Sequence, residues 1–329
     1  MKGATVTAAA LAVAITASLI GLALGSNPLP LPVVIEALVS YDASSSDHLV
    51  VVASRLPRVV LGLIVGAALG VSGALMQSLT RNPLGDPGIL GVNAGASAAV
   101  VIAIAYLGVT GVAQYTWFAY LGAALAAVLV FLLGSAGRSA GPARIALAGT
   151  AAGLSITALT QMVLISNETA FAQFRYWAVG SLQGRGFDVI AAIIPPVAIG
   201  LVGALALIGP LNSLALGDDT ARALGTRVGA TRIATAIVCV VLAGAATAAA
   251  GPIAFVGLAA AHIVRALSGD DHRWLIPGSM AVGAAVLVTA DAIGRAIVAP
   301  SELQTGISAA LLGSPVFIAL VRSRKLAAR

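Results

Sequence analysis

The chain contains very little charge and few aromatic residues. Of its 329 residues, only 9% are charged and 5% are aromatic, whereas 59% are hydrophobic. Its mean hydropathy is +1.03. Soluble domains carry roughly 25% charged residues. A chain with this composition cannot hide its apolar surface from water, so we expect a protein that lies in a lipid membrane.

Cysteine and histidine are also scarce. Cys239 is the single cysteine, which excludes a disulfide within the chain and argues against a cysteine-based metal site. The three histidines, His48, His262 and His272, are far apart and lack the spacing of metal ligands. We therefore expect no metal site and no cofactor in this chain.

Lysine is nearly absent, and the motifs of several enzyme classes are missing. The only lysines are Lys2 and Lys325, and no G-x-x-x-x-G-K-[ST] phosphate loop occurs. There is no G-x-S-x-G elbow and no H-E-x-x-H motif. We expect no catalysis by this chain alone. The net charge of +6 comes from arginines scattered between apolar runs, which does not indicate nucleic-acid binding.

What the chain does contain is a series of long apolar runs. They are continuous over about 20 residues, which predicts transmembrane helices and not the ~10-residue alternation of a β-barrel. We expect an all-α membrane protein with about ten spans in one transmembrane domain over 1–329. The predicted spans are 4–25, 59–79, 89–108, 116–135, 144–166, 188–208, 232–250, 253–267, 275–298 and 305–321.

The distribution of cations predicts the orientation. With ten spans and the N-terminus inside, five of the 18 cations fall on the outer side, and the other 13 fall on the cytoplasmic side. This bias follows the positive-inside rule and places both termini in the cytoplasm. The five outer cations are Arg55, Arg58, Arg175, Arg185 and Arg295.

A polar stretch, LGDDTARALGTRVG at 216–229, interrupts the apolar runs between spans six and seven. It predicts a short helix that Asp218 caps, with Asp219 near its positive end and Gly225 at its C-terminus. Asp218 and Arg222 have the i, i+4 spacing of an ion pair. The helix is either a solvated loop element or a docking element for a cytoplasmic partner. Its apolar side comprises Leu216, Ala221 and Leu224.

Charge inside the spans is nearly absent, and the clear candidates lie on span nine. Asp291 and Arg295 have i, i+4 spacing, and we expect them to neutralise each other near the outer end of that helix. The alternatives are an ion-coupling role for Asp291 and a surface role for Arg295. Carriers driven by ion gradients need ionisable groups at membrane depth. The near absence of such groups suggests that another source supplies the work of transport.

Span two and the segment after it carry a packing motif and a turn. Gly62, Gly66 and Gly70 are four residues apart, which predicts a face for close helix contact. The following segment, 80–96, contains two prolines and several glycines. Asn82 and Pro83 then belong to a turn with a specified conformation.

Together these segments resemble the FecCD family, the permeases of type II ABC importers for iron-siderophores, haem and vitamin B12. The resemblance covers nearly the whole chain in the order of the family. Two departures occur, since Ala261 replaces the usual proline before His262, and Gln304 and Thr305 replace the usual Pro-Val before Gly306. The matching segments are 55–96, 175–184, 216–225, 251–273, 290–295 and 305–317.

The resemblance implies the type II importer permease fold and a set of partners. A second permease, identical or homologous, would complete the pathway, and two ATPase subunits would bind ATP and Mg²⁺ on the cytoplasmic side. The loop at 212–229 would carry the coupling helix that docks to the ATPase. The implied coupling residues are Leu216, Gly217, Asp218, Asp219, Ala221, Arg222, Leu224 and Gly225.

On the outer side, the resemblance implies that a substrate-binding protein delivers the cargo. Arg55, Arg58 and Arg295 would meet glutamates of that protein, although helix-end pairing or snorkelling would also explain them. The expected function is the permease of a ferric siderophore importer in the cell membrane, with an apolar pathway that lacks a tight site. Haem and cobalamin are the alternatives within the family, and an ion-coupled secondary transporter or a scaffold are those outside it.

Overall fold

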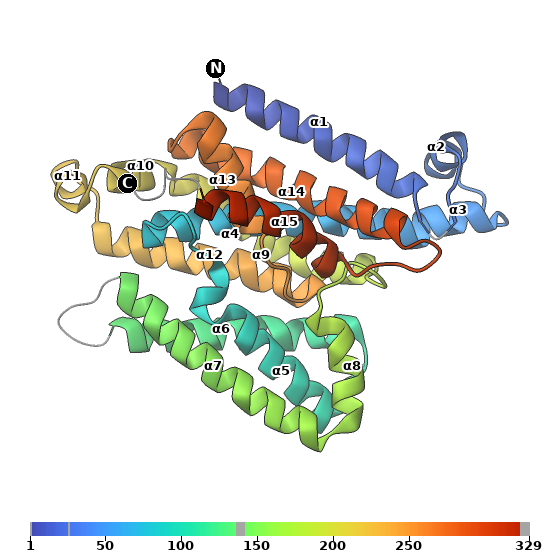
Figure 1. Cartoon of the computed structure of the whole chain (residues 1–329), viewed down its shortest axis with the longest axis horizontal. Helices are drawn as coiled ribbons and strands as arrows, with labels where there is room; N and C mark the ends of the chain where they lie inside the picture. Colours follow the sequence, from blue (N-terminus) through green and yellow to red (C-terminus); the bar gives the residue numbers. More distant parts are fainter. Residues whose placement is uncertain (1, 26, 136–141, 323–329) are drawn as a thin grey trace.

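The computed structural model describes residues 2–25, 27–135 and 142–322. Within these ranges all regular structure is helical. Figure 1 shows that most long helices run along the long axis of the molecule. Four of the cations predicted to be cytoplasmic lie outside the described residues, namely Arg138, Arg324, Lys325 and Arg329.

Each of the ten predicted apolar runs coincides with a helix. Within the described residues, seven helical stretches are long and apolar enough to cross a membrane, and α5 and α13 are shorter apolar helices. The chain is therefore a multi-pass membrane protein, as its composition predicts. The ten helices are α1 (Lys2–Ala23), α4 (Leu56–Thr80), α5 (Val92–Leu107), α6 (Val112–Ser135), α7 (Pro142–Ser166), α9 (Phe187–Ala206), α12 (Val228–Ala250), α13 (Val256–Ser268), α14 (His272–Ile297) and α15 (Thr305–Arg322).

Seven shorter helices lie between the long ones, and only α11 was expected from the sequence. The others are too short or too polar to produce a spanning signal, because hydropathy detects runs of about 20 residues. The short helices are α2 (Leu31–Val39), α3 (Ser46–Val50), the π-helix η1 (Val51–Arg55), the 3₁₀ helix η2 (Pro87–Leu90), α8 (Glu168–Ala178), α10 (Ile208–Ala215) and α11 (Asp218–Ala223).

The centre of the fold is the contact between α4 and α14, with α12 beside α4. The predicted glycine face of α4 forms this contact. A Cβ atom on Gly66 would lie 2.5 Å from the carbonyl oxygen of Gly283, and one on Gly70 would lie 2.0 Å from that of Ser279. Gly62 faces side chains of Leu182 and α14 instead. Only glycine allows the two backbones to approach this closely.

The chain segments that connect the long helices lie at the two opposite ends of the molecule's long axis. In Figure 1, α1 begins and α15 ends at the end of the molecule where α10 and α11 lie, and α2, α3 and α8 lie at the opposite end. We call these the inner and the outer end. The start of α1 and the end of α15 thus lie at the same end of the molecule, in agreement with the orientation that the cations predict.

Candidate functional site

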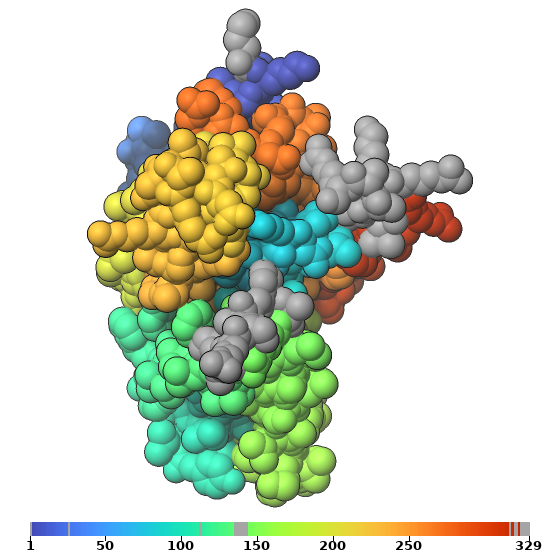
Figure 2. All heavy atoms as spheres, turned by 90° about the vertical axis from the view of Figure 1, so that its left-hand side faces the viewer, coloured from blue at the N-terminus to red at the C-terminus, as the bar shows by residue number. Residues whose placement is uncertain are grey.

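The most prominent polar element at the inner end is α11, the short helix predicted at 216–229. Figure 2 looks onto this end, where the segment containing α10 and α11 stands out in yellow beside the turn after α4. Gly225 follows the helix with φ of 82°, as expected for a left-handed C-terminal glycine. The structure thus confirms the predicted helix and its C-terminal end.

Two predicted interactions of α11 are wrong. Asp218 is the first helical residue, and Gly217 occupies the N-cap position without a side-chain cap. Arg222 pairs with Asp219 at 2.8 Å and not with Asp218. Both differences have one cause, which is that the carboxylate of Asp218 turns away from the helix toward two arginines of other elements.

These two arginines and Asp218 form what we call the aspartate clamp. Arg232, in the second turn of α12, donates from Nη2 to both carboxylate oxygens of Asp218 at 2.9 Å. Arg81, which follows α4, donates from Nη2 to Oδ1 of the same carboxylate. The same Nη2 also donates to the carbonyl oxygen of Leu214 on α10 at 3.3 Å. The carboxylate therefore connects α11 with α12 and with the turn after α4, and Arg81 also connects that turn with α10.

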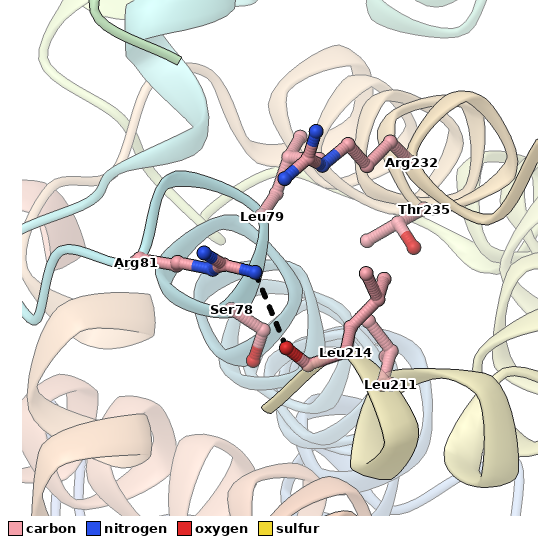
Figure 3. A pocket seen from close by; sticks show the side chains of 7 residues that line it. All are labelled: Ser78, Leu79, Arg81, Leu211, Leu214, Arg232 and Thr235. Atoms are coloured by element: carbon pink, nitrogen blue, oxygen red, sulfur yellow. Dashed lines mark hydrogen bonds between the residues drawn. The ribbon is translucent and has the colours of Figure 1, made fainter. Parts of the chain in front are cut away.

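A small pocket lies beside the clamp. Its volume is about 10 Å³, enough for roughly one water molecule. Figure 3 shows Arg81 and Arg232 entering it from different helices, and a dashed line marks the bond from Arg81 to Leu214. Its lining residues are Ser78, Leu79, Arg81, Leu211, Leu214, Arg232 and Thr235.

The charges of the clamp favour the ionised carboxylate. Partial burial raises the pKa of Asp218, but the positive charges of Arg232 and Arg81 outweigh it and hold the pKa below its ordinary value. The carboxylate therefore keeps its charge throughout the physiological pH range. The polar clamp fixes the start of α11 on the body of the molecule.

The other face of α11 is open to solvent and apolar at both of its ends. Leu216 is 64% exposed and Leu224 is 62% exposed, whereas Ala221 is fully buried. The charged side chains of Asp219 and Arg222 lie on the exposed side with them. Two exposed leucines beside a paired aspartate and arginine suit a contact with a protein surface, in which apolar anchors are surrounded by polar groups.

A second cluster of charges lies near the outer end, where the start of α4 meets the end of α14. Arg58 donates from Nε and Nη2 to the carboxylate of Asp291, at 2.9 to 3.2 Å. Arg295 pairs with the same carboxylate at 3.1 Å, and Thr305 donates its hydroxyl to it at 2.7 Å. Arg58 also pairs with Glu302. The predicted pair of Asp291 and Arg295 is confirmed, within a larger network.

The arginines of this outer cluster, and Arg55 near them, are buried against the chain itself. Arg295 is only 1% exposed, and Arg55 and Arg58 are each 6% exposed. Arg55 donates from Nη1 to two carbonyl oxygens near the end of α1, both at 2.7 Å. Arg295 donates to two carbonyl oxygens in the range 21–24, at 2.7 and 2.8 Å. Their predicted contact with a binding protein stays a prediction, but their partners in this structure belong to the chain itself.

The turn after α4 has the specified conformation that its prolines and glycines predict. Arg81 has a φ of 49°, and the side chain of Asn82 accepts a hydrogen bond from the amide of Leu84 at 2.9 Å. The carbonyl of Asn82 accepts another from Gly85 at 2.9 Å. Pro83 lies within this closed turn. The turn places Arg81 toward α11 and leads the chain into η2 and α5.

A groove between η2, α5 and α7 was not predicted from the sequence. Its volume is about 500 Å³, and its lining is mainly apolar with several polar side chains among the apolar ones. Its existence depends on how α7 packs on α5, which no local pattern encodes. Within the described residues, no three His, Cys, Asp or Glu side chains gather to hold a metal ion. The polar lining residues of the groove are Asp86, Asn93, Ser97, Thr150 and Thr157.

Comparison with known proteins identifies the family. The profile of the FecCD transport family matches residues 11–323. The chain is 44% identical to the ferric enterobactin transport system permease protein FepD of Escherichia coli (strain K12), over 94% of this chain and 92% of FepD. It is 39% identical to the hemin transport system permease protein HmuU of Yersinia pestis, over 81% of each chain. A solved structure, described as an inward-facing conformation of a metal-chelate type ABC transporter, matches with a TM-score of 0.84 and 25% identity, over 98% of this chain and 99% of that one. The chain therefore belongs to the FecCD transport family.

Proposed function

We propose that this membrane permease is a subunit of an ATP-driven importer for a ferric siderophore. The observation that carries the proposal is α11, a short helix fixed to the body by the aspartate clamp with Leu216 and Leu224 exposed. Such a helix fits the surface of a cytoplasmic partner. The similarity to FepD, a ferric enterobactin permease to which 94% of the chain aligns, supports a ferric siderophore as the cargo.

ATP hydrolysis belongs, in this proposal, to two separate ATPase subunits that bind ATP and Mg²⁺. The sequence contains no phosphate loop to perform it. A second permease, identical or homologous, completes the pathway, and a binding protein delivers the cargo from outside. The coupling residues of this chain are those of α11 and its ends, 216–225. Arg55, Arg58 and Arg295 contact the binding protein only if they leave the partners that bury them here.

The groove between η2, α5 and α7 is the part of this chain best suited to face the cargo. It is wide and open, and its mainly apolar lining also carries hydroxyl and amide groups and Asp86. The carboxyl of Asp86 accepts a hydrogen bond from the amide of Gly88 at 2.7 Å, and burial raises its pKa. Such walls offer weak hydrogen bonds to a large polar chelate and no fixed cation to retain it. The mainly apolar lining agrees with the apolar pathway without a tight site that the sequence predicts, and the polar groups are an addition to it.

Haem is the second candidate cargo, because HmuU aligns to 81% of this chain. An ion-coupled carrier finds less support, since Asp291 is already held by Arg58, Arg295 and Thr305.

The deciding experiment reconstitutes the permease in liposomes with its ATPase and binding protein. Uptake of ferric enterobactin that requires ATP and resists an uncoupler supports the proposal. Uptake that the uncoupler abolishes at constant ATP contradicts it.

A binding assay then decides the cargo. The binding protein that partners this permease is titrated with ferric enterobactin, ferric citrate, haemin and cobalamin. We expect the ferric siderophore to bind most tightly. Preference for haemin or cobalamin would assign the permease to the corresponding branch of the family without changing its mechanism.

A further inference from the structure

The orientation of α11 is only weakly fixed by its own packing. The helix is flanked by Gly217, with φ of 102°, and Gly225, with φ of 82°. A Cβ atom on either glycine would meet no atom within 4 Å. Of the helix itself, only Ala221 is buried. Glycines in open surroundings permit rotation of the segment between them, so another feature has to fix its direction.

The aspartate clamp supplies that feature. Asp218 lies at the start of α11, directly after the flexible glycine, and its carboxylate receives Arg81 and Arg232 from two different elements. Exposed ion pairs add little to global stability, and the side chain of Arg81 is 51% exposed. The clamp therefore adds little to stability, and its effect is to fix the position of α11 relative to α4 and α12.

The two arginines connect α11 with the centre of the fold. Arg81 directly follows α4, which contacts α14, α12, α13 and α9. Arg232 lies in α12, which contacts α4, α9 and α6. A displacement of Asp218 therefore acts on two buried helices at once. Without the clamp, α11 would reach α12 only through its own flexible ends and a few contacts.

We propose that Arg81 and Arg232 are positioning residues that transmit the movement of α11 to α4 and α12. When an ATPase subunit shifts α11, the clamp makes α4 and α12 move with it. The movement of the ATPase during hydrolysis thereby changes the conformation of the permease. This inference rests on the proposed function and assigns a role to two arginines outside the coupling segment 216–225. The clamp acts on the ratio of cargo moved to ATP hydrolysed and leaves the chemistry of hydrolysis untouched.

The test uses Arg81→Asn in the complete complex of permease, ATPase and binding protein in liposomes. Asparagine tolerates the left-handed backbone of position 81, and its short side chain removes the guanidinium together with most of the aliphatic stem. ATP hydrolysis and uptake of radioiron-labelled ferric enterobactin are measured together. We expect hydrolysis to continue while the cargo moved per ATP falls by about tenfold. Arg81→Lys, which keeps a positive donor on a long side chain, should recover part of the ratio, whereas Arg81→Met, which keeps the length without the charge, should not.

Arg273→Asn is the matched control. Arg273 forms an ion pair with Asp271 at 2.8 Å at the same end of the molecule, and its side chain is 73% exposed, but it does not contact α11. We expect the Arg273→Asn complex to move as much cargo per ATP hydrolysed as the unmodified complex does. An unchanged ratio for both Arg81→Asn and Arg232→Gln in assembled complexes would overturn the inference. If the unmodified complex itself fails to couple ATP to uptake, the proposed function fails instead, so the two failures are distinguishable.

Discussion

Arg295 offers a test at the scale of single residues. It is 1% exposed and binds Asp291 together with two carbonyl oxygens, one at the end of α1 and one just after it. Replacing it by glutamate places a second acid beside Asp291 and leaves those carbonyls without a donor. We expect Arg295→Glu to lower the free energy of unfolding by about 3–5 kcal/mol, the usual cost of breaking a buried pair. Thermal unfolding in detergent micelles measures it.

The double swap Asp291→Arg/Arg295→Glu provides the control. The i, i+4 spacing alone suggests that the swap restores stability. We expect no recovery, because residue 291 also faces Arg58, and the swap would place two arginines in contact. Full recovery of the unfolding temperature would show that Arg295 is the dominant partner of Asp291 and that Arg58 contributes little.

The same residues show the limit of what the sequence predicts. The pair of Asp291 and Arg295 was predictable, because four residues separate its members on one helix. The contact of Arg58 with Asp291 spans 233 positions, and that of Arg81 with Asp218 spans 137. Such contacts depend on which helices become neighbours, and no local pattern records this. The burial of the outer arginines and the turn of Asp218 away from its own helix therefore escaped prediction.

At the scale of elements, the contact between α4 and α14 depends on glycine. A Cβ atom at position 70 would lie 2.0 Å from a backbone carbonyl oxygen, which cannot move aside as a flexible side chain can. We expect Gly70→Ala to destabilise the protein by about 1–3 kcal/mol through overpacking. Gly153→Ala on α7 is the matched control, since its Cβ would meet no atom within 4 Å. Thermal unfolding of both variants compares them, and equal unfolding temperatures would contradict the close contact.

The exposed face of α11 provides the second test at this scale. Leu224 is 62% exposed at the C-terminal end of the helix, where a docked ATPase would cover it. Leu224→Asp places a charge in a contact that must lose its water. We expect the variant to insert and fold normally, but to lose copurification with the ATPase and transport-linked hydrolysis. Normal transport by this variant would make α11 an ordinary loop helix.

The elements themselves were largely predictable, because a membrane imposes a strict length on apolar helices. All ten predicted runs fall on helices, including the short run at 253–267, whose helix α13 begins only after Pro252. The helices α2, α3, α8 and α10 were missed. They lie at the ends of the molecule, where neither length nor hydropathy distinguishes them from loops.

At the scale of the whole molecule, the single cysteine permits a direct test of orientation. Cys239 is fully buried, so its thiol should not react with a water-soluble reagent. Two exposed alanines, Ala43 at the outer end and Ala223 on α11, serve as sites for new cysteines. In intact cells, a membrane-impermeant maleimide should label Ala43→Cys and leave Ala223→Cys unlabelled. After the membrane is opened, both should react, and the unmodified chain should stay unlabelled throughout.

The labelling experiment tests the orientation of the chain in the membrane, on which every functional assignment depends. The cation bias places α11 in the cytoplasm, where ATP is available, and places the buried arginine cluster toward the outside. The coupling role of α11 and the clamp requires this orientation, because ATPase subunits exist only on the inner side. Labelling of Ala223→Cys in intact cells would show that the molecule has the opposite orientation in the membrane. The clamp would then lie on the outer side, where the cargo is delivered. Protection of that site with labelling of Ala43→Cys would leave the inner end as the only place where ATP hydrolysis can act on this chain.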